Sequence, residues 1–177
     1  GEISGNEALV NERLRKYLSA RFQCESDILK TLRGINGIAQ YVDAFTMPDE
    51  SKWIATAHIE GTTLEKKIAE MCDINGVSTI SGREVAEYLQ GILLALTALD
   101  QHDIVHRDLH PGNIIINSKN NKPVLIDFGM AKFVKQNSDK DELETYLQGL
   151  SQGFKAAIGC TLHGGAPIYQ APEKEKN

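Results

Sequence analysis

The 177 residues predict an α+β fold, in which helices and short antiparallel strands occupy separate stretches of the chain. Two observations support this prediction. Apolar residues recur at three- and four-residue steps near the start of the chain and again in its middle, which is typical of helices. Short runs of β-forming residues, bounded by turn residues, follow each of these helical stretches.

The first third of the chain predicts a long helix followed by a hairpin. Residues 6–33 are expected to form the helix, which ends at Gly34. Residues 38–47 and 52–59 are rich in β-forming residues and are separated by the turn sequence PDES, so they are expected to pair as a hairpin. A polar helix over residues 64–72 follows. The apolar face of the long helix consists of Leu14, Leu18, Phe22, Leu29 and Leu32.

The middle of the chain predicts a second long helix that begins at Ser81. Ser81 can cap the helix, and Glu84, three residues later, completes a capping box. The helix is expected to run to about His102. Its sequence is apolar nearly all round, so we expect it to be buried.

A polar stretch and an acidic tripeptide follow this helix, and they contain the residues with clear chemistry. The stretch at 106–113 reads HRDLHPGN, and the tripeptide at 127–129 reads DFG. Apolar runs at 114–116 and 124–126, with a turn between them, are expected to be strands. Asp108 can accept a proton from a hydroxyl group. Asn113 and Asp127 offer oxygen atoms, the ligands that the hard cation Mg²⁺ prefers.

Composition limits the classes of partner and of cellular location. The net charge of −5 does not favour binding to nucleic acid or to an anionic membrane. No apolar run approaches the ~20 residues needed to span a bilayer. The three cysteines, at 24, 72 and 160, form no CxxC pair. We expect them to be reduced thiols in a cytoplasmic protein, with a metal or disulfide role as the less favoured alternative.

The HRDLHPGN and DFG sequences, in this order, resemble the catalytic loop and the DFG motif of protein kinases. Their aspartates, Asp108 and Asp127, are 19 residues apart. The sequence GAPIYQAPE at 165–173 is similar to the end of a kinase activation segment. The resemblance implies a two-lobed fold of protein-kinase type, with an incomplete small lobe at residues 1–62 and a truncated, mainly helical large lobe at residues 63–177.

The resemblance also implies a role for each site residue. Asp108 would accept the proton of the substrate hydroxyl, and Asn113 and Asp127 would hold Mg²⁺ between the phosphates of ATP. Arg107 would pair with a charged group on the activation segment. The residues implied around the adenine are Thr56, which controls access behind it, Ala57 and Ile59, whose backbone groups would bond its edge, and Ile115, which would lie beneath it.

Glu25 falls on the apolar face of the first helix, between Phe22 and Leu29. Spacing alone leaves two interpretations open: a carboxylate at the edge of the face that reaches water, or a member of an ion pair. The resemblance favours the second, because the corresponding kinase glutamate holds a nucleotide-binding lysine. It also implies that a stack of four residues joins the lobes, namely Leu29, Tyr41, His106 and Phe128.

The sequence departs from the kinase pattern in several places. The 177 residues contain neither a G-x-G-x-x-G loop nor a candidate for the strand lysine. We therefore expect a protein partner, or a chain segment outside this sequence, to complete the small lobe. His110 stands where serine/threonine kinases usually have lysine near the transferred phosphate, and Ala166 stands where they usually have threonine. The segment after residue 129 is long, and a helix is expected at 139–158.

Three functions are consistent with this pattern. The favoured one is ATP-dependent phosphoryl transfer to serine or threonine hydroxyls of a protein substrate, by this chain or by a larger kinase that contains it. A non-catalytic, kinase-like binding or regulatory module is the main alternative, because the glycine-rich loop and the lysine are missing. A small-molecule phosphotransferase of the same fold is less favoured, because the APE sequence at 171–173 indicates a protein substrate.

Overall fold

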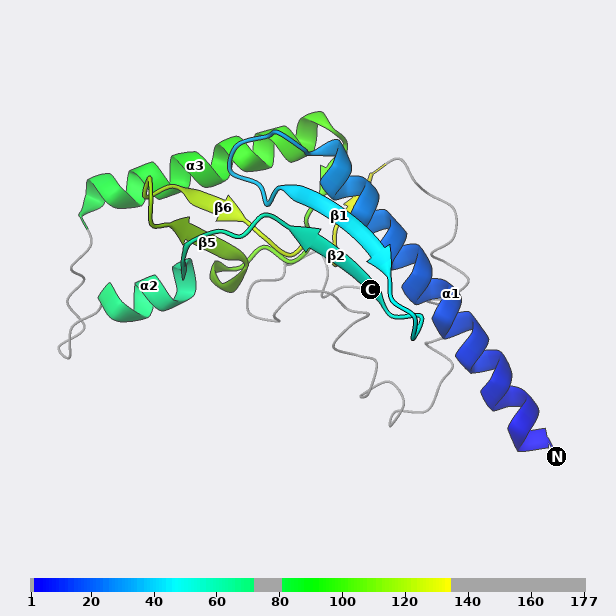
Figure 1. Cartoon of the computed structure of the whole chain (residues 1–177). Helices are drawn as coiled ribbons and strands as arrows, with labels where there is room; N and C mark the ends of the chain where they lie inside the picture. The colour runs from blue at the N-terminus through cyan, green and yellow to red at the C-terminus, as the bar shows by residue number, and fades with distance from the viewer. Residues whose placement is uncertain (1, 72–80, 135–177) are drawn as a thin grey trace.

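The computed structural model describes residues 2–71 and 81–134 (Figure 1). Within these ranges, helices and strands lie in separate layers, as the α+β prediction requires. The helices are α1 (Glu2–Thr31), α2 (Leu64–Met71), α3 (Gly82–Gln101) and the short 3-10 helix η1 (Pro111–Asn113). The strands are β1 (Tyr41–Thr46), β2 (Lys52–Thr56), β3 (Gly61–Thr63), β4 (Ile104–Val105), β5 (Ile114–Asn117), β6 (Pro123–Leu125) and β7 (Lys132–Phe133).

Helix α1 forms in the predicted stretch, but it spans Glu2–Thr31 rather than residues 6–33. Gly34 has a φ of +84°, a left-handed conformation that glycine adopts readily and that ends a helix. The last turn of α1 buries Ile28 and Leu29 against the core, and Leu32, just after the helix, is buried with them. Packing therefore fixes this end of α1, and with it the position of Glu25.

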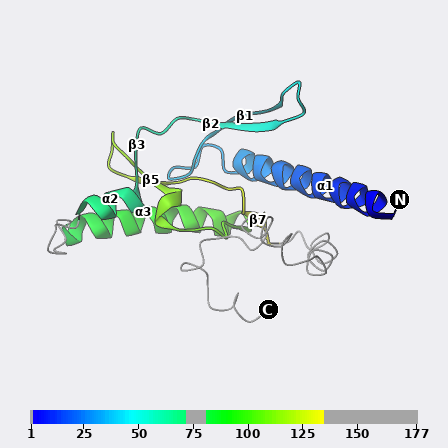
Figure 2. The same cartoon turned by 90° about the horizontal axis from the view of Figure 1, so that it is seen from below.

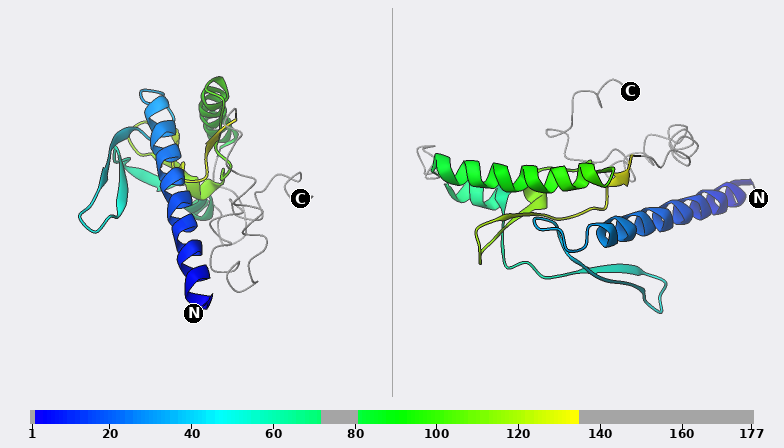
Figure 3. Two further views of the ribbon diagram at one scale, coloured as in Figure 1. Left: turned by 90° about the vertical axis from the view of Figure 1, so that its right-hand side faces the viewer. Right: turned by 90° about the horizontal axis from the view of Figure 1, so that it is seen from above.

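Strands β1 and β2 form the predicted hairpin, although both strands are shorter than expected. Tyr41 lies opposite Thr56, and Thr46 lies opposite Lys52. Ile59 lies beyond the end of β2. Figures 2 and 3 show the hairpin and α3 on opposite sides of the molecule, with α1 and the β5–β6 pair between them.

A three-stranded antiparallel sheet, in the order β3-β5-β6, lies beneath α3. Strands β5 and β6 correspond to the two predicted apolar runs. Strand β3, which pairs Gly61 with Asn117 and Thr63 with Ile115, was not predicted. Strands β4 and β7 pair as a second small sheet that was also missed. Because β3 pairs with β5, the expected lobe boundary at residues 62 and 63 falls inside a strand of this sheet, and the division into lobes stays a prediction.

Helix α3 begins with the predicted capping box. The Ser81 side chain accepts a hydrogen bond from the Glu84 amide at 3.2 Å, and the Glu84 carboxylate accepts one from the Ser81 amide at 3.3 Å. The helix ends at Gln101, with His102 as its C-cap. Capping thus sets both the start of α3 and the position of the loop that follows it.

The prediction that α3 is buried all round is wrong for the described residues. Tyr88, Ala95 and Leu99 are buried, but Leu93 is 61% and Leu94 is 64% exposed, and Leu89 is exposed as well. The buried residues face the sheet, whereas no described element covers the opposite side of the helix. Apolar content alone does not show whether a second layer covers a helix.

The Ser81 cap provides a stability prediction. We expect Ser81→Ala to lower the free energy of unfolding by about 1 kcal/mol, because the Glu84 amide at the start of α3 loses the hydroxyl oxygen that accepts its hydrogen bond. Ser81→Thr keeps a hydroxyl oxygen at this position and should stay close to the wild type. Denaturant unfolding followed by circular dichroism measures both variants. Equal stability of the alanine and threonine variants would show that the cap does not limit stability.

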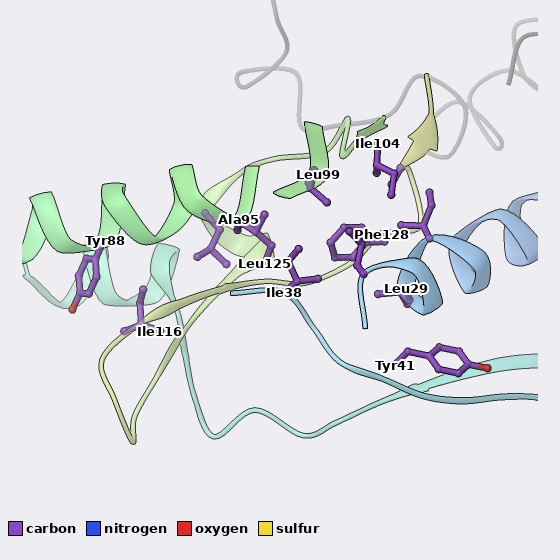
Figure 4. Close-up of a cluster of buried hydrophobic side chains, with 14 residues drawn as sticks. Leu29, Ile38, Tyr41, Tyr88, Ala95, Leu99, Ile104, Ile116, Leu125 and Phe128 are labelled. Carbon is purple, nitrogen blue, oxygen red and sulfur yellow. The ribbon is translucent and has the colours of Figure 1, made fainter. Parts of the chain in front are cut away.

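Phe128 lies at the centre of the buried core (Figure 4). Phe128 is 1% exposed. Figure 4 shows its ring surrounded by Leu29 of α1, Leu99 of α3, Ile104 of β4 and Ile38, which precedes β1. Burying a phenylalanine contributes roughly 1.5–3 kcal/mol. Because Phe128 is buried in the core, it holds the adjacent Asp127 loop in a fixed position at the edge of the core.

Several sequence predictions lie outside the described residues. They concern Cys72, Cys160, the helix at 139–158, Ala166 and the sequence at 165–173. Within the part of the chain that the structure describes, no helix has the length and apolar character required to cross a membrane.

Candidate active site

The loop between β4 and β5 brings Asp108 and Asn113 into direct contact. The Asn113 side-chain amide donates one hydrogen bond to the main-chain oxygen of Asp108 and another to its carboxylate Oδ2, both at 3.0 Å. Asn113 is the last residue of η1 and is only 8% exposed. A buried amide that bonds the same residue twice holds the Asp108 carboxylate in one orientation.

The Asp127 loop is joined to the Asp108 loop through the main chain. The Ile126 amide donates to the Asn113 carbonyl at 3.0 Å. Asp127 follows with a φ of +59°, and its Oδ1 accepts a hydrogen bond from the Gly129 amide at 3.1 Å. Left-handed φ values in non-glycine residues cost about 1–3 kcal/mol and cluster at functional sites. Arg107, with a φ of +68°, is a second such residue in the same place.

The donor atoms of Asn113 and Asp127 suit a hard divalent cation. Because the Asn113 NH₂ group is bonded to Asp108, its carbonyl Oδ1 points away and can act as a ligand. The Asp127 side chain is exposed and has a second carboxylate oxygen beyond the one that Gly129 bonds. An amide oxygen and a carboxylate, with water completing the shell, are the ligands that Mg²⁺ takes in nucleotide sites. These residues therefore fit the expected ion.

His106 and Phe128 support the two loops from below. Their ring centroids lie 4.9 Å apart, and the His106 Nε2–H donates to the Ile126 carbonyl at 3.2 Å. Burial lowers the pKa of His106, because charging the imidazole inside the core would cost its hydration. Leu29 and Tyr41 are buried in the same apolar cluster as Phe128. The structure thus brings the four expected stack residues into one region.

Glu25 is directed from α1 toward the Asp127 loop. A Cβ added at Gly129 would lie 3.6 Å from Glu25 Oε2 and 3.1 Å from Asp127 Oδ1, so both carboxylates line the same glycine. Within the described residues, Glu25 forms no salt bridge. Burial raises the pKa of Glu25, and the negative charge of Asp127 raises it further, while Arg21 acts in the opposite direction.

Arg21 was not singled out from the sequence, but it connects α1 to the chain after Gly129. Its guanidinium donates to the Ala131 carbonyl at 3.4 Å and to the Met130 sulfur at 3.7 Å. The Cys24 thiol donates to the same carbonyl at 3.9 Å. Arg21 lies four residues before Glu25, and that helical spacing is the signal that could have identified it.

The state of Glu25 provides a prediction on stability. A pKa raised above its ordinary value of 4.5 means that the folded chain holds this proton more tightly than the unfolded chain. The resulting stabilisation is complete below about pH 4.5 and is lost as the pH rises through the folded-state pKa. We therefore expect Glu25→Gln to melt at a higher temperature than the wild type at neutral pH, with the difference shrinking toward pH 4.

Thermal unfolding of the 177-residue chain at several pH values measures this difference. Arg15→Gln on the exposed side of α1 is a control for a change of charge on the same helix. If the wild type melted at the higher temperature at neutral pH, Glu25 would have a cationic partner, and the unpaired state described here would be wrong.

Comparisons with known proteins agree with this geometry. The family model described as "Protein kinase domain" matches residues 8–173. The chain belongs to the protein kinase family. The match covers both loops and α1, so the fold expected from the motifs is confirmed at the level of the family.

Individual relatives of this kinase domain are named serine/threonine-protein kinases. Serine/threonine-protein kinase C of Synechocystis is 32% identical over 166 residues, which are 94% of this chain and 28% of the relative. Serine/threonine-protein kinase nekl-2 of Caenorhabditis elegans is 38% identical over 139 residues, 77% of this chain and 33% of the relative. The chain thus spans about a third or less of the length of these relatives.

The residues expected at the hinge lie at the end of β2 and in the segment between β2 and β3. Thr56 ends β2 and is exposed, and the Ala57 amide donates to the Gln40 carbonyl at 2.8 Å, so its carbonyl is the group left for a ligand. Ile59 is half-buried. Ile115 packs toward the same segment, because a Cβ at Gly61 would lie 2.8 Å from its Cγ2. The roles of these residues at an adenine stay predictions.

Arg107 and His110 lie on either side of Asp108 in the expected catalytic loop. Both side chains are half-buried. His110 Nε2 lies 3.8 Å from Asp108 Oδ2, on the side of the loop that faces η1. The part of the chain with which Arg107 was expected to pair lies outside the described residues, so its role stays a prediction.

Proposed function

We propose that this kinase domain transfers the γ-phosphoryl group of Mg²⁺-bound ATP to serine or threonine hydroxyls of a protein substrate. The observation that carries the proposal is the double hydrogen bond from Asn113 to Asp108, together with the main-chain bond from Ile126 to Asn113. These bonds link the proton acceptor to both expected metal ligands. The names of the serine/threonine kinase relatives support the choice of substrate.

Each residue has a defined task in this proposal. Bound Mg²⁺ neutralises phosphate charge. Asn113 offers its Oδ1 to the ion while its NH₂ group orients Asp108. Asp127 offers its free carboxylate oxygen, and the Gly129 amide fixes the other one. The Asp108 carboxylate accepts the proton of the substrate hydroxyl; its Oδ1 is buried and has no hydrogen-bond partner among the described residues.

Nucleotide titration with and without Mg²⁺ tests the proposal. We expect Asp127→Ala to abolish both the Mg²⁺-dependent part of ATP binding and transfer to a protein substrate. Asp127 is exposed but accepts a hydrogen bond from the Gly129 amide, so the unfolding temperature of the apo chain should fall only slightly. Asp100→Ala, an exposed carboxylate on α3, is the matched control and should behave as the wild type. Unchanged Mg²⁺-dependent binding in Asp127→Ala would contradict the proposal.

One observation favours a second candidate, a non-catalytic kinase-like module. Glu25 has no basic partner among the described residues, although active kinases pair this glutamate with lysine. In that case, ATP and Mg²⁺ would leave the melting temperature unchanged, and binding to another protein would persist in Asp127→Ala. The same titration therefore separates the two candidates.

We also propose that a further chain segment or a protein partner covers the β1–β2 hairpin. Val42, Phe45 and Trp53 on this hairpin are all exposed, and Trp53 is 56% exposed. A two-stranded hairpin is marginally stable by itself, so the exposed apolar residues support an added layer. A longer natural chain with a higher melting temperature and a protected Trp53 would support this proposal.

A further inference from the structure

We propose that His110 positions Asp108 as a neutral imidazole whose proton is on Nε2, rather than serving as a mobile cation. The inference rests on the proposed function only for its effect on transfer; the location of the proton follows from hydrogen bonding alone. His110 precedes η1 in an extended conformation, with φ −149° and ψ 164°. It is thus the N-cap residue of the short helix that ends in Asn113.

The Gly112 amide determines where the proton lies. This N–H donates to His110 Nδ1 at 3.1 Å. A main-chain amide can only donate, so Nδ1 must offer a lone pair and carry no proton. A neutral imidazole has one proton, which is then on Nε2. A doubly protonated ring would place an N–H opposite the Gly112 N–H and break the cap.

The protonated nitrogen lies beside the proposed base. His110 Nε2 is 3.8 Å from Asp108 Oδ2, the same oxygen that accepts the Asn113 amide at 3.0 Å. The distance exceeds that of a hydrogen bond, but such contacts in apo enzymes often shorten when substrate binds. Two N–H groups thus lie near Oδ2, while Oδ1 is without a hydrogen bond in the described part of the chain. The two N–H groups therefore fix the carboxylate through Oδ2, and the buried Oδ1 is left as its unsatisfied acceptor.

Gly112 is required for this arrangement of the ring. A Cβ at position 112 would lie 2.7 Å from His110 Cε1 and 2.9 Å from Nδ1, so the imidazole packs directly on the glycine. Glu65 Oε2 lies 3.3 Å from the same point. The ring is therefore confined between the η1 backbone and α2. A confined ring suits a positioning role, whereas contact with a moving phosphate would require a longer reach.

Nitrogen-detected NMR of the ¹⁵N-histidine-labelled chain at neutral pH tests the proton location without any activity. We expect His110 to show the signature of an unprotonated Nδ1 and a protonated Nε2. In Gly112→Ala this signature should be lost, because the added methyl group displaces the ring. A ring protonated on Nδ1, or on both nitrogens, would overturn the proposal.

Kinetics of two substitutions separate the cap from the contact with Asp108. His110→Ala removes both, so it should lower kcat about tenfold, the scale of one hydrogen bond, and reduce stability. His110→Asn keeps a capping oxygen but does not reach Asp108, so stability should be retained while kcat falls to a similar extent. The KM for ATP should change little in both. His102→Ala removes the hydrogen bond between the His102 ring and the Ala98 carbonyl at the end of α3, and it is the control for loss of a histidine hydrogen bond outside the site.

The outcomes distinguish this inference from the proposed function. Wild-type kcat in His110→Asn would show that only the cap matters and would overturn the positioning role. Absence of transfer in the wild type would instead contradict the proposed function, and the NMR signature would then decide the proton location by itself.

Discussion

Asp108→Asn is expected to lower kcat by about 10²–10⁴, the contribution that general acid–base catalysis typically makes. The substitution replaces a carboxylate by an amide of nearly the same shape. An amide oxygen at this position can still accept the hydrogen bond that Asn113 Nδ2 donates at 3.0 Å, so the loop should keep its structure. The capacity to take a proton from the substrate hydroxyl is lost. Nucleotide affinity should not change, because Asp108 is not among the expected metal ligands.

Steady-state transfer to a protein substrate and nucleotide titration together check this result. Asp100→Asn makes the same chemical change at an exposed position on α3 and should leave both quantities unchanged. A rate close to that of the wild type would show that Asp108 is not the base. A parallel loss of nucleotide affinity would show that the amide disturbed the Asn113 ligand.

The sequence predicted the parts of the site that depend on local spacing. Asp108 and Asn113 are five residues apart, with Pro111 and Gly112 between them, and a single turn of helix is enough to bring them together. The approach of Asp127 required only two short strands joined by a tight turn, which β5 and β6 provide. Family resemblance then assigned roles that spacing alone could not. The assignment to the protein kinase family is confirmed, whereas the individual roles stay predictions.

Features that depend on contacts distant in sequence could not be predicted. Strand β3 is only three residues long, and it exists because Gly61 to Thr63 pair with β5, more than fifty residues away. The exposed side of α3 depends on what packs against it, which composition does not specify. Arg21 bonds residues about 110 positions later. Each of these depends on tertiary arrangement rather than on a local pattern.

His110 shows a different limit of sequence reasoning. The resemblance placed His110 where serine/threonine kinases usually have a lysine near the transferred phosphate, and that role stays a prediction. What the resemblance did not indicate is the hydrogen bond that the Gly112 amide donates to His110 Nδ1. That bond requires a residue without a side chain at position 112. It therefore depends on His110 and Gly112 together, whereas a residue-by-residue comparison considers each position separately.

Gly61→Ala is expected to cause the largest loss of stability in the described part of the chain. A Cβ at this position would lie 2.2 Å from the Ile116 carbonyl oxygen and 2.8 Å from Ile115 Cγ2. The nearest atom is main chain in the middle of a sheet, so the methyl group cannot be accommodated by a rotamer change. Overpacking of this kind costs about 1–3 kcal/mol, or more when the backbone must move.

Gly82→Ala is the matched control for this prediction. Gly82 is the first residue of α3, and a Cβ there meets no atom within 4 Å. Alanine favours a helix over glycine, so this variant should melt at or slightly above the wild-type temperature. We expect Gly61→Ala to melt about 2–4 °C lower for each kcal/mol lost. Because β3 must separate from β5 to admit the methyl group, Ile115 would shift from the hinge, and ATP affinity should fall with stability. A Gly61→Ala variant with wild-type melting temperature would mean that β3 does not pair with β5 as described.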